Sequence, residues 1–67
     1  MFIEITITAI DGIPCDAERA QWINADRIDG FASYPKDPKL TEVIYDQCTL
    51  LIKGHADWFA AQLNGKD

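Results

Sequence analysis

The sequence predicts an α+β fold, in which a small antiparallel sheet of about four strands carries a C-terminal helix packed on one face. Three observations lead to this prediction. Residues 2–10 alternate between apolar and polar side chains, which is the period of a half-buried strand. Short β-prone runs bounded by turn-forming residues recur from residue 31 onward. Residues 42–63 then hold two further strand-like runs and the clearest helical pattern of the chain.

The first strand is expected over residues 2–10. Its isoleucines at positions 3, 5 and 7, together with Ala9, share one face, and Glu4 lies on the other. Phe2 and Ile10 are apolar on this otherwise polar face, so we expect the ends of the strand to be covered. Asp11 and Gly12 follow as a two-residue hairpin turn, because glycine adopts a positive φ without a steric penalty.

Residues 13–21 support more than one interpretation. Pro14 lacks a backbone donor and the following residues favour a helix, which predicts a short helical turn or a bulged excursion with Asp16 as a possible N-cap. A full helix over residues 16–25 is the rival interpretation. Against that helix, Trp22 and Ile23 have the character of a brief strand.

The middle of the chain is read as turns and short strands. Residues 24–28 form a turn, because Asn and Asp side chains bond to their own backbone, and Asp29 with Gly30 marks another. Further strands are expected over residues 31–34, 40–46 and 48–53, with a proline-containing loop over residues 35–39.

The helix is expected over residues 55–63, after Gly54 breaks the last strand. Phe59 and Leu63 lie four residues apart and form one apolar stripe that docks on the sheet. Trp58 is rotated by about 100° from Phe59 around the helix axis, so it points away from the core centre. Gly65 is expected to end the helix in a left-handed conformation.

Length and charge limit the functions that the chain supports. Its 67 residues allow a single domain over residues 1–67. The formal net charge is −5 and no Lys/Arg run occurs, which argues against direct binding to nucleic acid or to a membrane surface. An acidic surface instead suits a basic protein partner. We expect a cytoplasmic protein with free thiols, since no signal-peptide pattern is present, and a monomer or a homodimer.

The chain has few residues that could form a catalytic or metal site. Cys48, His55 and Asp57 invite a cysteine-enzyme hypothesis, but a sheet this small has little room for a substrate pocket. Two isolated cysteines and one histidine do not match the spacing of a zinc site. We therefore expect no enzyme activity, no metal and no cofactor.

A strand-like run over residues 2–8 is followed by segments 23–28, 43–45 and 50–53 and by the helical segment 56–63. In the order of these elements the chain resembles the small flagellar FlbD-type proteins, and related short phage-encoded proteins show a similar plan. The chain departs from that pattern by inserting residues 14–21 and by placing Gly54 and His55 just before the helix. The resemblance implies a small antiparallel sheet with a C-terminal helix, and it brings no catalytic residues.

The functional hypothesis that we favour is a non-enzymatic acidic interaction module. Its most specific form is a phage or mobile-element inhibitor, similar in size and acidity to anti-CRISPR and DNA-mimic proteins. It binds a nucleic-acid-binding host complex and blocks DNA binding by charge mimicry. The alternative is an FlbD-like flagellar or housekeeping role through self-association, and a small cysteine enzyme is a distant third. The expected partner-binding residues are Asp11, Asp16, Glu18, Asp26, Asp29 and Trp58.

Overall fold

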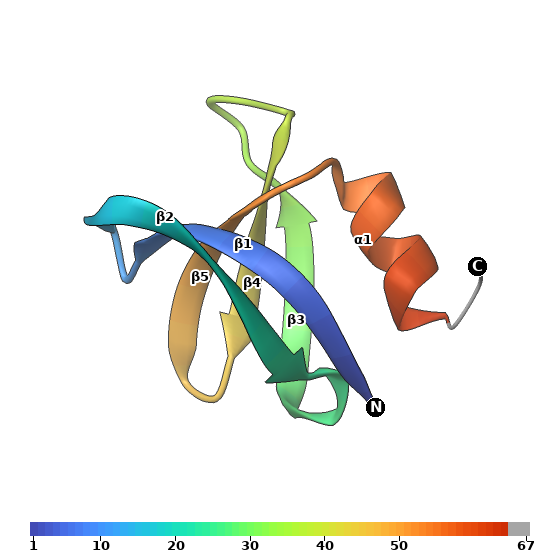
Figure 1. Cartoon of the computed structure of the whole chain (residues 1–67). Coiled ribbons are helices and arrows are strands. Elements are labelled where there is room, and N and C mark those ends of the chain that lie inside the picture. Colours follow the sequence, from blue (N-terminus) through green and yellow to red (C-terminus); the bar gives the residue numbers. More distant parts are fainter. Residues whose placement is uncertain (65–67) are drawn as a thin grey trace.

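The structure is a computed structural model and describes residues 1–64. Within these residues the chain forms five strands, a short 3₁₀ helix and one α-helix (Figure 1). Their bounds are β1 (Phe2–Ile10), β2 (Ile13–Asn24), η1 (Ala25–Arg27), β3 (Ile28–Ser33), β4 (Leu40–Tyr45), β5 (Cys48–Lys53) and α1 (Ala56–Leu63). All neighbouring strands are antiparallel, in the order β2-β1-β5-β4-β3. The fold class predicted from the sequence is therefore wrong, because the molecule is mostly a five-stranded sheet with one short helix.

The additional strand is β2, of which the sequence indicated only the brief strand at Trp22 and Ile23. It pairs with β1 from Phe2 opposite Asn24 to Ile7 opposite Arg19. The helical turn, the helix over residues 16–25 and the N-cap at Asp16 are all wrong, whereas the bulged excursion is correct. Pairing with β1 supplies a ladder of backbone hydrogen bonds and buries Ile23, and this tertiary gain outweighs the local preference for helix.

A bulge divides the β1–β2 hairpin into two halves. The register shifts between Ile7 and Ala9, and residues 15–18 of β2 are left out of the ladder. Beyond the shift Ala9 lies opposite Leu51 and Ile10 lies opposite Leu50. Because the side-chain period of a strand is two, the shift places Ala9 on the outer face, where it is still buried, and turns Ile10 toward the core. The prediction that Ala9 shares a face with the three isoleucines is therefore wrong.

The predicted turns have mixed outcomes. Asp11 and Gly12 form the expected hairpin turn, with φ values of 51° and 81°. The turn after β2 is η1, where the Asn24 side chain accepts a hydrogen bond from the Asp26 N–H at 3.0 Å. The turn predicted at Asp29 and Gly30 is wrong, because both residues lie within β3 beside a register shift. The helix end predicted at Gly65 lies outside the described residues.

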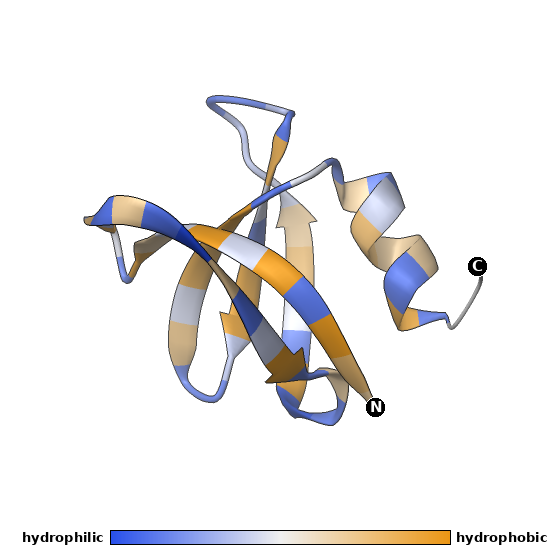
Figure 2. Ribbon diagram, viewed as in Figure 1, coloured by the Kyte–Doolittle hydropathy of each residue, from blue (hydrophilic) through white to orange (hydrophobic). Residues whose placement is uncertain are grey.

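The core lies on the concave face of the sheet. Alternate residues of β1 point inward, which Figure 2 shows as orange segments separated by paler or blue ones. The buried cluster comprises Ile3, Ile5, Ile7, Ile23, Val43, Leu50, Ile52 and Phe59. Thr41 is also fully buried, and its hydroxyl donates a 2.7 Å hydrogen bond to the carbonyl of Gly54. No polar side-chain atom buried in the described chain lacks a partner.

The sheet is strongly curled because its two edge strands follow each other in sequence. η1 joins the end of β2 to the start of β3, and the Asn24 N–H donates to the Tyr45 hydroxyl at 3.1 Å. Helix α1 lies beside β3 and β4 and covers the open side of the curl (Figure 1). Phe59 is completely buried there, and its ring centroid lies 5.0 Å from that of Phe31 in an edge-to-face arrangement.

Among the described residues, no helix has the length and apolar character needed to cross a membrane.

Replacing Phe59 by alanine tests whether the helix holds the curled sheet together. We expect Phe59→Ala to lower the free energy of unfolding by about 3–5 kcal/mol, because it leaves a cavity at the centre of the core. Urea denaturation followed by circular dichroism measures this loss. Phe2→Ala is the matched control, since Phe2 is 63% exposed. Equal losses in the two variants would contradict the assigned role of Phe59.

Candidate functional site

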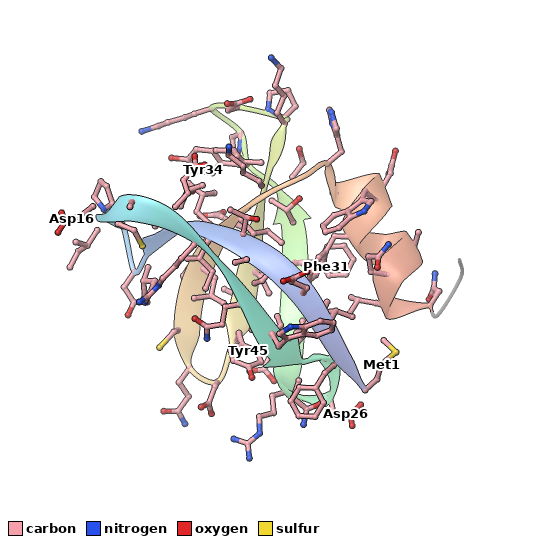
Figure 3. The ribbon with its side chains drawn as sticks, in the orientation of Figure 1. Met1, Asp16, Asp26, Phe31, Tyr34 and Tyr45 are labelled. Atoms are coloured by element: carbon pink, nitrogen blue, oxygen red, sulfur yellow. The ribbon has the colours of Figure 1, made fainter. Side chains whose placement is uncertain are left out.

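The six residues predicted to bind a partner lie in three separate places. Asp11, Asp16 and Glu18 are at the tip of the β1–β2 hairpin, Asp26 and Asp29 are at η1 and β3, and Trp58 is on α1. Figure 3 shows Asp16 at the far tip of the hairpin and Asp26 beside Met1 at the opposite end. The long strand β2 separates the two groups. The fold therefore distributes these carboxylates along the hairpin and does not gather them into one patch.

Three of these carboxylates are held by local interactions. Asp11 accepts a hydrogen bond from the Thr49 N–H at 2.8 Å, which ties the β1–β2 turn to β5. Glu18 lies 2.6 Å from the Lys53 ammonium, and Asp26 lies 3.5 Å from the N-terminal ammonium. These contacts give each of the three side chains a role within the fold. Asp16 and Asp29 are exposed and have no ion pair within residues 1–64.

Trp58 has a structural role as well as an exposed edge. Its indole covers Gly54, so that a Cβ atom added at Gly54 would lie only 2.7 Å from Trp58 Cε3. Its side chain also lines a shallow groove of about 520 Å³ between β1 and the start of α1, where Glu4 and His55 contribute polar groups. Trp58 is 40% exposed, as its position on the helix predicts. Much of this tryptophan therefore serves to cover the strand-to-helix turn.

The most exposed aromatic residues are two that sequence reasoning did not select. Phe2 is 63% exposed and Trp22 is 62% exposed. Glu4 lies directly opposite Trp22 in the β1–β2 ladder, and Phe2 lies opposite Asn24. Because paired residues share a face, Phe2, Glu4 and Trp22 form one surface, which we call the outer hairpin face. The expected cover over Phe2 is absent from the described chain, and its apolar character on a polar strand face was the available signal.

The outer hairpin face adjoins a strand edge without a neighbour. In the described chain β2 pairs with β1 on one side, and no strand pairs with its other side. Pro14 and the bulge at residues 15–18 interrupt the first half of this edge, whereas residues 19–24 follow a regular register. An edge of this kind presents backbone donors and acceptors that another chain can pair with. The regular half lies beside Trp22, so aromatic anchors and backbone groups are offered together.

The geometry separates the residues of the cysteine-enzyme hypothesis. Cys48 begins β5, whereas His55 directly precedes α1 after β5 has ended. An extended strand of that length places the two residues roughly 20 Å apart. Cys48 packs against the core, and His55 is exposed. Within residues 1–64, no group of three His, Cys, Asp or Glu side chains is arranged to hold a metal ion.

The contact between Gly54 and Trp58 is testable by a double-mutant cycle. Gly54 has a φ of 118°, and Gly54→Ala both strains this backbone and drives a Cβ into the indole. We expect Gly54→Ala to lower the free energy of unfolding by about 1–3 kcal/mol in the wild-type background. The loss should be smaller in a Trp58→Ala background, where the steric conflict is removed. Strictly additive losses in urea denaturation would show that the indole does not cover Gly54.

Comparison with known proteins adds no assignment. The chain matches no protein-family model, no curated protein and no solved structure. The similarity to FlbD-type proteins therefore stays a prediction from the segments given above.

Proposed function

We propose that this chain is a non-enzymatic protein-interaction module that binds its partner through the outer hairpin face and the adjoining edge of β2. The observation that carries the proposal is the exposure of Phe2, two residues before Glu4 on β1, and of Trp22, opposite Glu4 on β2. Large aromatic side chains dominate the binding energy of protein interfaces when they become buried. Neither residue contributes to the buried core of this small domain, so folding alone does not account for them.

Charge favours a basic partner. The chain has a formal net charge of −5, and its exposed carboxylates extend along the hairpin from Asp16 at the tip to Asp26 at the other end. Such a spread matches an extended basic groove better than a single basic pocket. Grooves that hold nucleic acid are lined in this way, because they neutralise successive phosphates. The partner we propose is a nucleic-acid-binding protein or complex.

In its specific form, the proposal is an inhibitor encoded by a phage or mobile element. The hairpin occupies the partner's nucleic-acid path, with carboxylates in the positions of phosphates and the aromatic pair as apolar anchors. Carboxylates speed association through long-range attraction, and the aromatic residues slow dissociation. The module then acts as a competitor, and no chemical step is required.

Self-association is the second candidate, and one observation favours it. The regular half of the β2 edge is long enough to pair with the same strand of a second copy. A mass measurement by light scattering at high protein concentration separates the two functions. A monomeric mass removes the support for self-association, whereas a dimer that dissociates in the Trp22→Ala variant supports it.

The proposed interface predicts separate effects of aromatic and charged substitutions on partner binding. The partner is first identified by co-purification from the native host, and its dissociation constant is then measured. Trp22→Ala should weaken binding by about 10–100-fold, within the range of an interface hot spot. The double variant Asp16→Lys with Asp29→Lys should chiefly slow association, and added salt should do the same.

A matched control and a competition measurement complete this experiment. Gln62→Ala shortens a partly exposed side chain on α1, which is outside the proposed interface, and should leave the affinity unchanged. DNA or RNA should compete with the module for the partner. Unchanged affinity in the Trp22→Ala variant would refute the interface, and simultaneous binding of nucleic acid and module would refute competition.

A further inference from the structure

A small hollow lies on the outer face of the sheet, away from the outer hairpin face. Register alone aligns its base, since Pro14, Ala9, Leu51 and Glu42 stand in one row across β2, β1, β5 and β4. Tyr34, just after β3, lines it as well. Its volume is about 180 Å³, and it is more enclosed than the three larger hollows of the described surface.

The bulge in β1 produces this hollow. By turning Ala9 to the outer face, it places a methyl group between the larger Pro14 and Leu51 side chains. A small residue between larger neighbours leaves a depression. Thr8, the residue within the bulge, stabilises it by donating a hydrogen bond from its hydroxyl to the Leu51 carbonyl at 3.0 Å.

Glu42 gives the hollow its chemical character. Among the described residues that line it, Glu42 carries the only carboxylate, and the other walls are an aromatic ring, a hydroxyl and apolar groups. Glu42 is partly buried and has no ion pair within residues 1–64. A partly buried carboxylate without a partner of its own can accept charge-assisted hydrogen bonds from a matching cation.

The chain's own cation at this position is engaged elsewhere. Lys53 lies diagonally across from Glu42, because Leu40 pairs with Lys53 and Glu42 pairs with Leu51. The Lys53 ammonium nevertheless lies 2.6 Å from the Glu18 carboxylate, which projects from the bulged part of β2. The Glu18–Lys53 pair therefore leaves the Glu42 carboxylate available to an external cation.

We infer that this hollow binds one arginine side chain of the partner. The volume is below the roughly 300–1,000 Å³ of pockets that take drug-sized ligands, and it suits a single side chain. A guanidinium forms two parallel hydrogen bonds with a carboxylate, and its planar group stacks on an aromatic ring such as that of Tyr34. The methylene groups of arginine then lie along Leu51 and Pro14. This inference rests on the proposed function, since it names a residue type on the basic partner.

Binding of a small probe tests the hollow without the partner. The probe is N-acetyl-arginine amide, titrated into the ¹⁵N-labelled chain, with N-acetyl-lysine amide compared in parallel. We expect amide shifts centred on Gly12, Glu42, Thr49 and Leu51 for the arginine probe, and at least fivefold weaker binding for lysine. Glu42→Gln should reduce arginine binding at least tenfold. The matched control Glu4→Gln removes a carboxylate from the outer hairpin face and should have no effect.

Three results would overturn the inference. The first is a set of shifts spread over all exposed carboxylates, which indicates general charge attraction. The second is unchanged binding in Glu42→Gln, provided that the variant retains the wild-type amide spectrum. The third is equal affinity for lysine, which removes the guanidinium assignment.

Failure of the hollow is distinguishable from failure of the proposed function. If partner affinity falls in Trp22→Ala but not in Glu42→Gln, the outer hairpin face stands and the arginine site does not. If the probe binds as expected and Trp22→Ala leaves partner affinity unchanged, the arginine site stands and the proposed interface does not.

Discussion

Burial of Phe59 is the interaction on which the rest of the structure depends. The sheet is curled because β2 and β3 are its two edges and are joined by η1, and the curl leaves one side of the concave face open. Phe59 fills that opening and meets Phe31 of β3. A domain of this size buries only about 60% of the surface of its unfolded chain, so a single large side chain supplies a substantial part of the core.

The connection between β5 and α1 positions this side chain. Gly54 has a φ of 118°, which lets the chain leave the strand and start the helix within two residues. The buried hydroxyl of Thr41 holds the Gly54 carbonyl at 2.7 Å, and the Trp58 indole closes over the same glycine. Backbone conformation, a buried hydrogen bond and an aromatic cover thus act together at one residue.

Local patterns in the sequence were sufficient where they agreed with tertiary structure. The alternation in β1 and the apolar stripe of α1 are both present, and the hairpin turn at Asp11 has the expected positive φ. Apart from Trp22 and Ile23, β2 was not predicted as a regular strand because its residues favour a helix, and only pairing with β1, which is not visible in a local window, makes it a strand. The same reason explains the wrong turn prediction at Gly30, which lies within β3 beside a register shift.

The candidate site was harder to predict than the fold. The acidic residues were identified correctly as exposed groups, but their separation depends on the length of β2 and on the strand order. The sequence showed that Trp58 diverges from Phe59. It did not show that Gly54 lies beneath the indole, or that Trp22 is more exposed than Trp58. Which aromatic side chain remains in water is decided by the curl of the sheet, which no local pattern encodes.

The single shift of register in β1 changes which residues of the hairpin face the core. Up to Ile7, odd-numbered residues face the core, and beyond the shift Ile10 does so while Ala9 faces outward. Whether an odd-numbered residue of β1 faces the core therefore depends on which side of the bulge it lies. Without the extra residue Thr8, the ladder with β5 would be regular and Ile7, Ala9 and Ile10 would keep the same partners. A strand that kept Thr8 but lost the bulge would instead turn Ala9 inward and Ile10 outward, so the bulge decides which apolar residue the hairpin tip buries.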